Sequence, residues 1–170
     1  DRPNHRAQTM SVILQALFDK VPWEKEHALR VAELCRMLGE ALDMYPEQVQ
    51  RLHTLGLIHD IGKLSINYEL FLKPGPLSDE ETAEVQRHSE MGYRIVSAMS
   101  DMVDISEYVL SHHERFDGSG YPRGLVGRQI PFYSRILAVA DAWESMTYAR
   151  PYRPALSFEA AADELKANAG

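Results

Sequence analysis

The sequence contains a single cysteine in 170 residues, which makes a disulfide-stabilised secreted fold a poor interpretation. Cys35 lies within an apolar helical pattern, so a buried free thiol in a reducing compartment is favoured over a disulfide or a nucleophile. The sequence also has no apolar run near the roughly 18 residues needed to span a bilayer, and no signal-peptide pattern. These absences favour a cytoplasmic domain.

Positive charge is also scarce, with 18 Lys and Arg residues against 25 Asp and Glu residues and a net charge of −7. A protein that binds nucleic acid through a broad basic face needs clustered Lys and Arg, so this class is disfavoured. An anionic substrate would therefore require bound cations. The share of hydrophobic residues, 45%, is typical of one globular domain with a core.

Alternating strand patterns of useful length are absent, whereas apolar residues recur at helical spacing along most of the chain. The sequence therefore predicts an all-α fold. Pro22, Pro46 and Pro131 suit first helical turns, and Ser78 with Glu81 has the spacing of a capping box. The expected helices cover residues 10–21, 22–43, 46–62, 78–99, 101–112, 131–146 and 157–168.

The first expected helix differs in role from the rest. Residues 1–21 form an amphipathic segment that would pack on the domain, serve as a stem from an upstream domain or pair with a second copy. Residues 22–170 form the main domain. Because the chain starts at Asp1 without a Met, we expect it to be a piece of a longer protein.

Two segments interrupt the helical pattern. Residues 63–77 contain the motif KPGP and are expected to form an irregular connection. Residues 114–130 hold five helix breakers, so this segment must be a long loop. These breakers are Gly118, Gly120, Pro122, Gly124 and Gly127. Long ordered loops are usually functional.

Histidines and aspartates provide the candidate chemistry. Asp60 follows His59 at the end of the third expected helix, and His112 precedes His113 at the end of the fifth. Neighbouring residues on a helix point about 100° apart, so such pairs can straddle two metal ions. The pattern therefore indicates a multinuclear metal site.

Other candidates are isolated along the sequence. Single helical histidines are more often ordinary hydrogen-bonded residues than ligands, and His5 and His53 keep that interpretation. His27 and His88 are further candidate ligands. Asp141 interrupts the apolar run ILAVADAW, where an ionised carboxylate is costly unless it has a local partner or binds a metal. A ligand role is favoured for Asp141.

Three motifs in order, HTLGLIHDIGK, HHERFDGSGYP and ADAWESMTYARPYR, resemble the HD-GYP family of metal-dependent phosphohydrolases. The matches run from about Glu26 to Ser157. The resemblance implies a compact helical HD-type domain with a metal centre held between helices and a long GYP loop. It also implies hydrolysis of the bacterial second messenger cyclic di-GMP to pGpG, and in some members on to GMP.

The resemblance also assigns roles to individual residues. Lys63, Asp60 and His59 would be catalytic, with Asp60 bridging two ions and Lys63 near enough to reach a phosphate oxygen. Tyr121, Arg150 and Arg153 would contact the substrate, and guanidinium forks suit its second phosphate. The implied metal ligands are His27, His59, Asp60, His88, His112, His113 and Asp141. Iron or manganese fits this mixture of donors.

Some positions depart from the family pattern. Trinuclear members carry a glutamate where this chain has Trp23, and Glu24 is expected to point elsewhere, so two ions are expected and a third is not. Glu144 replaces an aspartate, and Tyr148 and Ala149 replace a Ser-Asp pair. These departures put the fit of the substrate in doubt more than the binding of metal.

The segment Asp117 to Pro122 is expected to bind no metal. The motif residues within it are Asp117, Gly118, Gly120, Tyr121 and Pro122. The resemblance suggests a wall beside the site that presents Tyr121 to the ligand and offers a docking surface to a diguanylate cyclase (GGDEF) domain. Family members generally continue past Gly170, so part of the helical cover is expected to be absent. A bacterial cytoplasmic location, within a larger sensor or regulator, is also expected.

The leading hypothesis is thus a cyclic di-GMP phosphodiesterase. The alternatives within the same chemistry are another cyclic dinucleotide, such as cyclic GMP-AMP, or another nucleotide phosphoester. From a different class, a catalytically silent module would bind the dinucleotide or a partner protein. A convincing Ser-His-Asp or reactive-Cys arrangement is missing from the sequence, which agrees with catalysis by metal ions.

Overall fold

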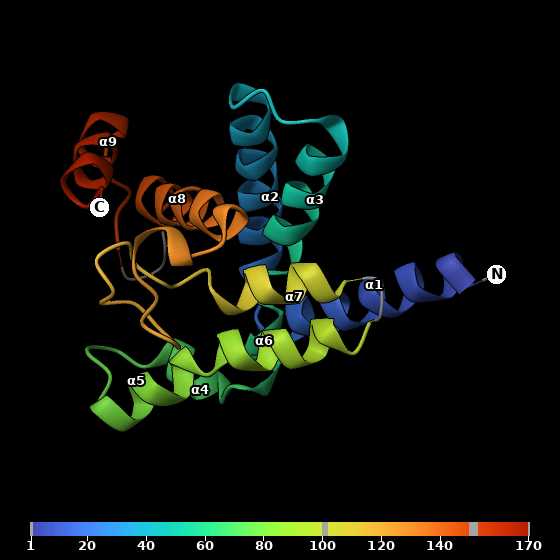
Figure 1. Cartoon of the computed structure of the whole chain (residues 1–170). Helices are drawn as coiled ribbons and strands as arrows, with labels where there is room; N and C mark the ends of the chain where they lie inside the picture. The colour runs from blue at the N-terminus through green and yellow to red at the C-terminus, as the bar shows by residue number, and fades with distance from the viewer. Residues whose placement is uncertain (1, 100–101, 150–152, 170) are drawn as a thin grey trace.

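The protein is described by a computed structural model that covers residues 2–99, 102–149 and 153–169. Within these ranges the chain forms helices and loops with no β-strand, which confirms the all-α prediction (Figure 1). The elements are α1 (Arg2–Lys20), α2 (Glu24–Ala41), α3 (Pro46–Ile58), the 3₁₀ helix η1 (Ile61–Ser65), α4 (Tyr68–Leu72), α5 (Asp79–Gln86), α6 (His88–Ser97), α7 (Val103–Leu110), the 3₁₀ helix η2 (Gly127–Gln129), α8 (Phe132–Thr147) and α9 (Phe158–Ala167).

Helices α2 and α3 stand side by side as a pair, and α8 packs against α2. Their apolar faces meet α6 and α7 in one core, because residues at helical spacing present a continuous stripe to the interior. The fully buried core residues include Val31, Leu52, Leu55, Val109 and Leu137. This core leaves the ends of α3, α5 and α7 close together at one place.

The contact between η1 and α6 brings two backbones unusually close. A Cβ atom added to Gly62 would lie 1.8 Å from the carbonyl oxygen of His88 and 2.5 Å from the backbone nitrogen of Gly92. Only a residue without a side chain fits at this point. The close approach fixes Asp60, which precedes η1, relative to His88.

Helix α1 belongs to the core through its second half. Leu17 and Val21 are buried, and the ammonium of Lys20 donates to the carbonyl oxygens of Leu64 and Ile66 at 2.7 and 2.6 Å. Val12, on another face, is 68% exposed. The segment 1–21 is thus tied to η1, and its role as a stem or dimer helix stays a prediction.

The structure corrects two of the expected helices and one expected loop. The helix expected over 46–62 ends at Ile58, and the chain continues as a 3₁₀ helix. The helix expected over 78–99 is two helices that meet at Arg87. Helix α6 buries one face against η1 and α7, whereas α5 buries no residue. The direction of each helix is therefore set by different packing partners. Residues 63–77 are not wholly irregular, since they contain α4.

The expected helix caps and the expected buried cysteine are confirmed. Ser78 and Glu81 form the capping box of α5, and the Ser157 hydroxyl accepts from the backbone of Ala160 at the start of α9. Cys35 is a buried free thiol, and burial raises its pKa to about 12. In the described part of the chain, no helix combines the length and the hydropathy that a membrane span requires.

Replacement of Gly62 by alanine should destabilise the protein by on the order of 3 kcal/mol, because the added methyl group has no free volume between η1 and α6. Urea denaturation measures the loss. Gly75→Ala is the control, since its Cβ would meet nothing within 4 Å and only its positive φ of 89° opposes the change, at about 1 kcal/mol. Equal losses for the two variants would contradict the close contact.

Candidate metal centre

Three histidines share one structural feature: each lies at or just beyond a helix end and bonds to a carbonyl of the last turn. The Nδ1 atoms of His59, His88 and His112 lie 2.8, 2.7 and 2.6 Å from the carbonyl oxygens three residues earlier, those of Gly56, Val85 and Val109. Such terminal carbonyls need partners from outside the helix. A carbonyl only accepts, so Nδ1 carries the proton in each ring. The lone pair of each Nε2 is left for another partner.

His27 is held by a carboxylate instead. Its Nδ1 lies 2.6 Å from Oε2 of Glu144, which is buried in α8. The other oxygen of Glu144 accepts from Nε and Nη2 of Arg30 at 2.8 and 2.7 Å. Carboxylates that hold a histidine ring in this way fix its tautomer and raise its basicity as a metal ligand. The sequence analysis treated Glu144 only as a departure from the family pattern, and it gave Arg30 no role at the site.

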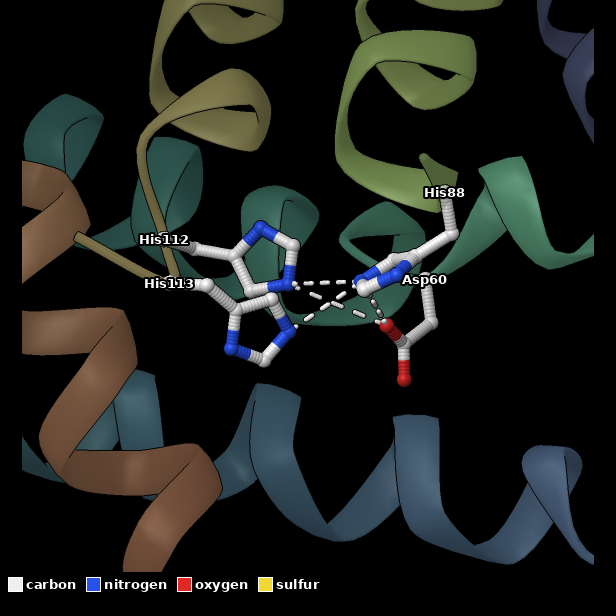
Figure 2. A group of neighbouring side chains, drawn as sticks. All are labelled: Asp60, His88, His112 and His113. Atoms are coloured by element: carbon white, nitrogen blue, oxygen red, sulfur yellow. Dashed lines mark hydrogen bonds and ion pairs between the residues drawn. The ribbon is translucent and has the colours of Figure 1, made fainter. Parts of the chain in front are cut away.

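The first group of possible ligands contains Asp60, His88, His112 and His113, whose donor atoms lie within 4.8 Å of one another. Figure 2 shows the four side chains converging, with His112 and His113 on one segment and Asp60 and His88 on two others. The Nε2 atom of His88 lies 3.1 Å from that of His113 and 3.3 Å from Oδ1 of Asp60. The Nε2 atom of His112 lies 3.8 Å from the same oxygen.

The second group contains His27, His59 and Asp141. The Nε2 atoms of the two histidines are 3.3 Å apart, and Oδ1 of Asp141 lies 3.4 and 3.8 Å from them. Oδ2 of Asp60 is 3.5 Å from His27 and 3.3 Å from His59. The two oxygens of Asp60 therefore face different groups of histidines, as a bridging ligand requires.

Lys63 and Glu24 complete the centre. Asp60 precedes η1, and residues three apart in a 3₁₀ helix eclipse each other, so Lys63 Nζ reaches Oδ2 of Asp60 at 2.6 Å. Lys63 also donates to Oε1 of Glu24 at 2.7 Å. The expectation that Glu24 points elsewhere is wrong, because it is buried and forms a third possible ligand group with His27 and Asp60. Trp23 packs on Tyr68, with ring centroids 6.1 Å apart.

Burial and nearby charges shift the pKa values of His27, in the second group, and His88, in the first group, in opposite directions. Burial disfavours a charged His27, but hydrogen bonds to Asp60 and Glu144 outweigh it and raise its pKa to about 10. Burial lowers the pKa of His88 to about 4. Metal ions need neutral imidazole, so an ion at the second group must displace a proton from His27, whereas His88 is already neutral at pH 7.

The charges around Asp60 also compensate one another. Burial opposes its ionisation, yet His59 and Lys63 hold the pKa of this carboxyl well below its usual range. Burial likewise disfavours the ammonium of Lys63, but the charges of Asp60 and Glu24 raise its pKa. Lys63 is therefore a positive charge at neutral pH.

The loop 114–130 is fastened to the end of α7. Glu114 is buried, and its two oxygens accept from the backbone nitrogens of Arg123 and Leu125 at 2.7 and 2.9 Å. A Cβ atom on Gly120 would lie 2.3 Å from the backbone nitrogen of Arg115, so glycine is required there. Glu114 is a second residue that sequence reasoning did not single out.

The GYP segment contacts the first group through its tyrosine. The Tyr121 ring stacks on His113, with centroids 4.9 Å apart, and meets the edge of His88. Asp117 lies outside the centre, and its carboxylate accepts from the backbone and hydroxyl of Ser119. Gly118 has a positive φ of 83° at this exposed tip, and Pro122 follows Tyr121.

Of the two arginines expected to contact the substrate, the structure describes one, and it is not in this cluster. Arg153 is exposed, and its guanidinium donates to the carbonyl oxygen of Ser145. Arg150 lies outside the described residues. The seven expected ligands are all gathered at the centre, and their imidazole nitrogens and carboxylate oxygens are donors that suit Fe²⁺, Mn²⁺ or Zn²⁺. Their ligand roles stay predictions.

The helical fold and the buried cluster of histidines and aspartates define the class of the protein as a helical domain with a candidate metal centre. The family model described as HD domain matches residues 11–170. The chain therefore belongs to the HD domain family, within its HD-GYP type.

Among curated relatives, 3'3'-cGAMP-specific phosphodiesterase 1 of Vibrio cholerae is 43% identical over 132 residues, covering 78% of this chain and 31% of the relative. The cyclic di-GMP phosphodiesterase response regulator RpfG of Xanthomonas campestris is 38% identical over 143 residues. This match covers 83% of this chain and 38% of the relative. The chain thus spans well under half the length of these relatives.

Solved structures support the fold. An HDG"Y"P protein from Bdellovibrio bacteriovorus superposes with a TM-score of 0.70 at 23% identity, covering 88% of this chain and 47% of that one. The HD domain of the Listeria monocytogenes phosphodiesterase PgpH gives a TM-score of 0.67 at 15% identity, covering 91% and 81%.

Glu144→Gln should weaken metal binding at the second group by about 10- to 100-fold. A glutamine offers one oxygen and one NH₂, so it can accept from His27 or from Arg30 but not from both. Competition with a fluorescent chelator measures the affinity for Mn²⁺. Glu26→Gln is the matched control, because the Glu26 side chain is 69% exposed and its nearest partner, Arg30, is 3.9 Å away. Unchanged affinity in Glu144→Gln would contradict the positioning role.

Proposed function

We propose that this chain is the catalytic domain of a metal-dependent phosphodiesterase that cleaves cyclic di-GMP to pGpG, with further hydrolysis to GMP as a second step. The observation that carries the proposal is the position of the Asp60 carboxylate, whose two oxygens face two separate groups of histidines. This is the arrangement that two neighbouring divalent ions need. A pure binding module would have no use for it.

The reaction explains why such a centre is useful. A phosphodiester is negatively charged and repels a nucleophile, and a pair of metal ions activates water and clamps the phosphate oxygens. His59 and Asp60 would hold such a pair in place. Lys63, 14% exposed and held by Asp60 and Glu24, places a fixed positive charge beside them. Because its pKa is raised, Lys63 suits stabilisation of phosphate charge better than proton transfer.

The names of the relatives favour one class of substrate, the cyclic dinucleotides. Curated relatives are named as cyclic di-GMP phosphodiesterases and as 3'3'-cGAMP-specific phosphodiesterases. One solved structure, with a TM-score of 0.59, is titled as a PgpH HD domain in complex with cyclic-di-AMP. Cyclic GMP-AMP is therefore the second candidate, favoured by the relative with 43% identity. Hydrolysis of another nucleotide phosphoester and catalytic silence are the remaining alternatives.

The roles of the loops follow from their positions. Tyr121 lies on the rings of the first group, where it would contact the bound substrate. Arg150 and Arg153 would reach its second phosphate, which for Arg153 requires release of the Ser145 carbonyl. The exposed tip at Asp117 is the proposed docking point for a GGDEF domain. Pairing through α1 and a bacterial cytoplasmic location within a larger regulator complete the proposal.

We propose two ions, iron or manganese, one at each group. His27 has its Nδ1 committed to Glu144, so its single Nε2 can serve the second group or a site with Glu24, but not both. One observation favours a third ion. Within the described part of the chain, Oε2 of Glu24 is buried and has no hydrogen-bond partner.

Metal analysis of the purified protein should give two ions per chain, and Glu24→Gln should leave that number unchanged, because Glu24 then serves only to hold Lys63. Inductively coupled plasma mass spectrometry provides the count. Three ions in the unaltered protein, falling to two in Glu24→Gln, would show that Glu24 is a ligand and that the proposed number is wrong.

The unaltered protein supplied with Mn²⁺ or Fe²⁺ should convert cyclic di-GMP to pGpG. A variant that combines His59→Ala and Asp60→Ala should lose at least about 1,000-fold in rate, because both metal groups lose ligands. Product analysis by chromatography checks both results. Circular dichroism shows whether the variant is folded.

Wild-type product formation no faster than that of this double variant would reject the enzymatic function. Turnover of cyclic GMP-AMP alone would select the second candidate.

A further inference from the structure

A pocket of about 220 Å³ opens beside the second ligand group. His27 and Lys63 contribute to its lining on the side of the metal centre, and Trp23, Phe71 and Tyr148 supply three aromatic rings. We propose that this pocket binds one nucleobase of the cyclic dinucleotide and selects guanine over adenine. This inference rests on the proposed function, since it names the base that the same site accepts.

The pocket has the lining that a base needs. A nucleobase presents two flat apolar faces, and stacking on an aromatic side chain stabilises a bound base of any kind. Tyr148 is 45% exposed and lies at the end of α8, and Trp23 precedes α2. Helix α2 also carries His27 and helix α8 carries Asp141, which are two of the three members of the second group. A base in the pocket is therefore adjacent to the centre where its phosphate would lie.

Arg30 supplies hydrogen-bond donors that can distinguish guanine from adenine. Its guanidinium lies over the Tyr148 ring at 4.1 Å, and Nε and Nη2 bond to Oε1 of Glu144. Nη1 is less engaged, since the described contact with Glu26 is 3.9 Å long. Guanine offers two acceptors, O6 and N7, to an arginine, whereas adenine places an NH₂ donor at the position of O6. A donor-only side chain therefore favours guanine.

The fixed position of Arg30 makes it selective. Held by Glu144 on one side and Tyr148 on the other, the guanidinium cannot turn away to accommodate an adenine. The pocket also requires only one guanine per ligand. Cyclic di-GMP and cyclic GMP-AMP should both fit, and cyclic di-AMP should be rejected.

Tryptophan fluorescence tests base binding without any hydrolysis. The chain has two tryptophans, and Trp143→Phe leaves Trp23 as the reporter. In the metal-loaded Trp143→Phe protein, GMP should quench Trp23 at a concentration about tenfold lower than AMP does. Adding Tyr148→Leu to this variant should weaken the binding of GMP about tenfold, because the base loses a ring on which it stacks. Tyr45→Leu is the matched control, since Tyr45 is 74% exposed and lies beyond the opposite end of α2.

Substrate selectivity provides the second measurement. In Arg30→Gln, the ratio of kcat/KM for cyclic di-GMP to that for cyclic di-AMP should fall about tenfold, because glutamine can pair with adenine. Arg30 also holds Glu144, so absolute rates will fall as well. Arg30→Lys is the control for that effect: lysine also disturbs the pairing with Glu144 but remains a donor-only side chain, so it should slow both substrates and keep most of the preference for cyclic di-GMP.

The outcomes separate the two proposals. Equal quenching by GMP and AMP, insensitive to Tyr148→Leu, would overturn the base pocket even if the protein hydrolyses cyclic di-GMP. An unchanged selectivity ratio in Arg30→Gln would also overturn it. A guanine preference in binding without any hydrolysis would support the pocket and reject the enzymatic function instead.

Discussion

The hydrogen bond between a histidine Nδ1 and a helix-end carbonyl is the interaction on which the metal centre depends. Inside a helix these carbonyls are occupied by the backbone, so a histidine three residues later has no such partner. At the ends of α3, α5 and α7 they become available, and His59, His88 and His112 use them. The chain thus orients three rings with its own backbone, and their free nitrogens converge on Asp60.

The second requirement is that buried charges neutralise one another. An isolated ionised group is expensive to bury, but paired groups are tolerated. Lys63 lies between Asp60 and Glu24, and Arg30 is paired with Glu144. These two ion pairs flank the pocket beside the centre and give it positive groups on fixed supports. Charge neutralisation and ligand orientation are therefore produced by the same side chains.

Sequence reasoning found the helices, the loop 114–130 and the seven gathered ligands, because periodicity and motif order are local properties. It could not find the break at Arg87, where no proline or glycine marks the change and only the packing of α6 on η1 distinguishes the two helices. Glu24 was missed for a similar reason: a position counted along an ideal helix is uncertain at the first turn, where α2 begins. Glu144 and Arg30 become interpretable only when α8 lies across α2.

Glu114 divides the glycine-rich loop into two parts with different freedom. Its carboxylate fastens the chain at Arg123 and Leu125, and Gly120 lies against the backbone of Arg115, so the part near the histidines is fixed. The tip around Asp117 bonds mainly within itself. Mutations at the tip can therefore accumulate without displacing the clustered histidines. Divergence among related chains can then remodel this exposed surface while the His/Asp cluster is inherited unaltered.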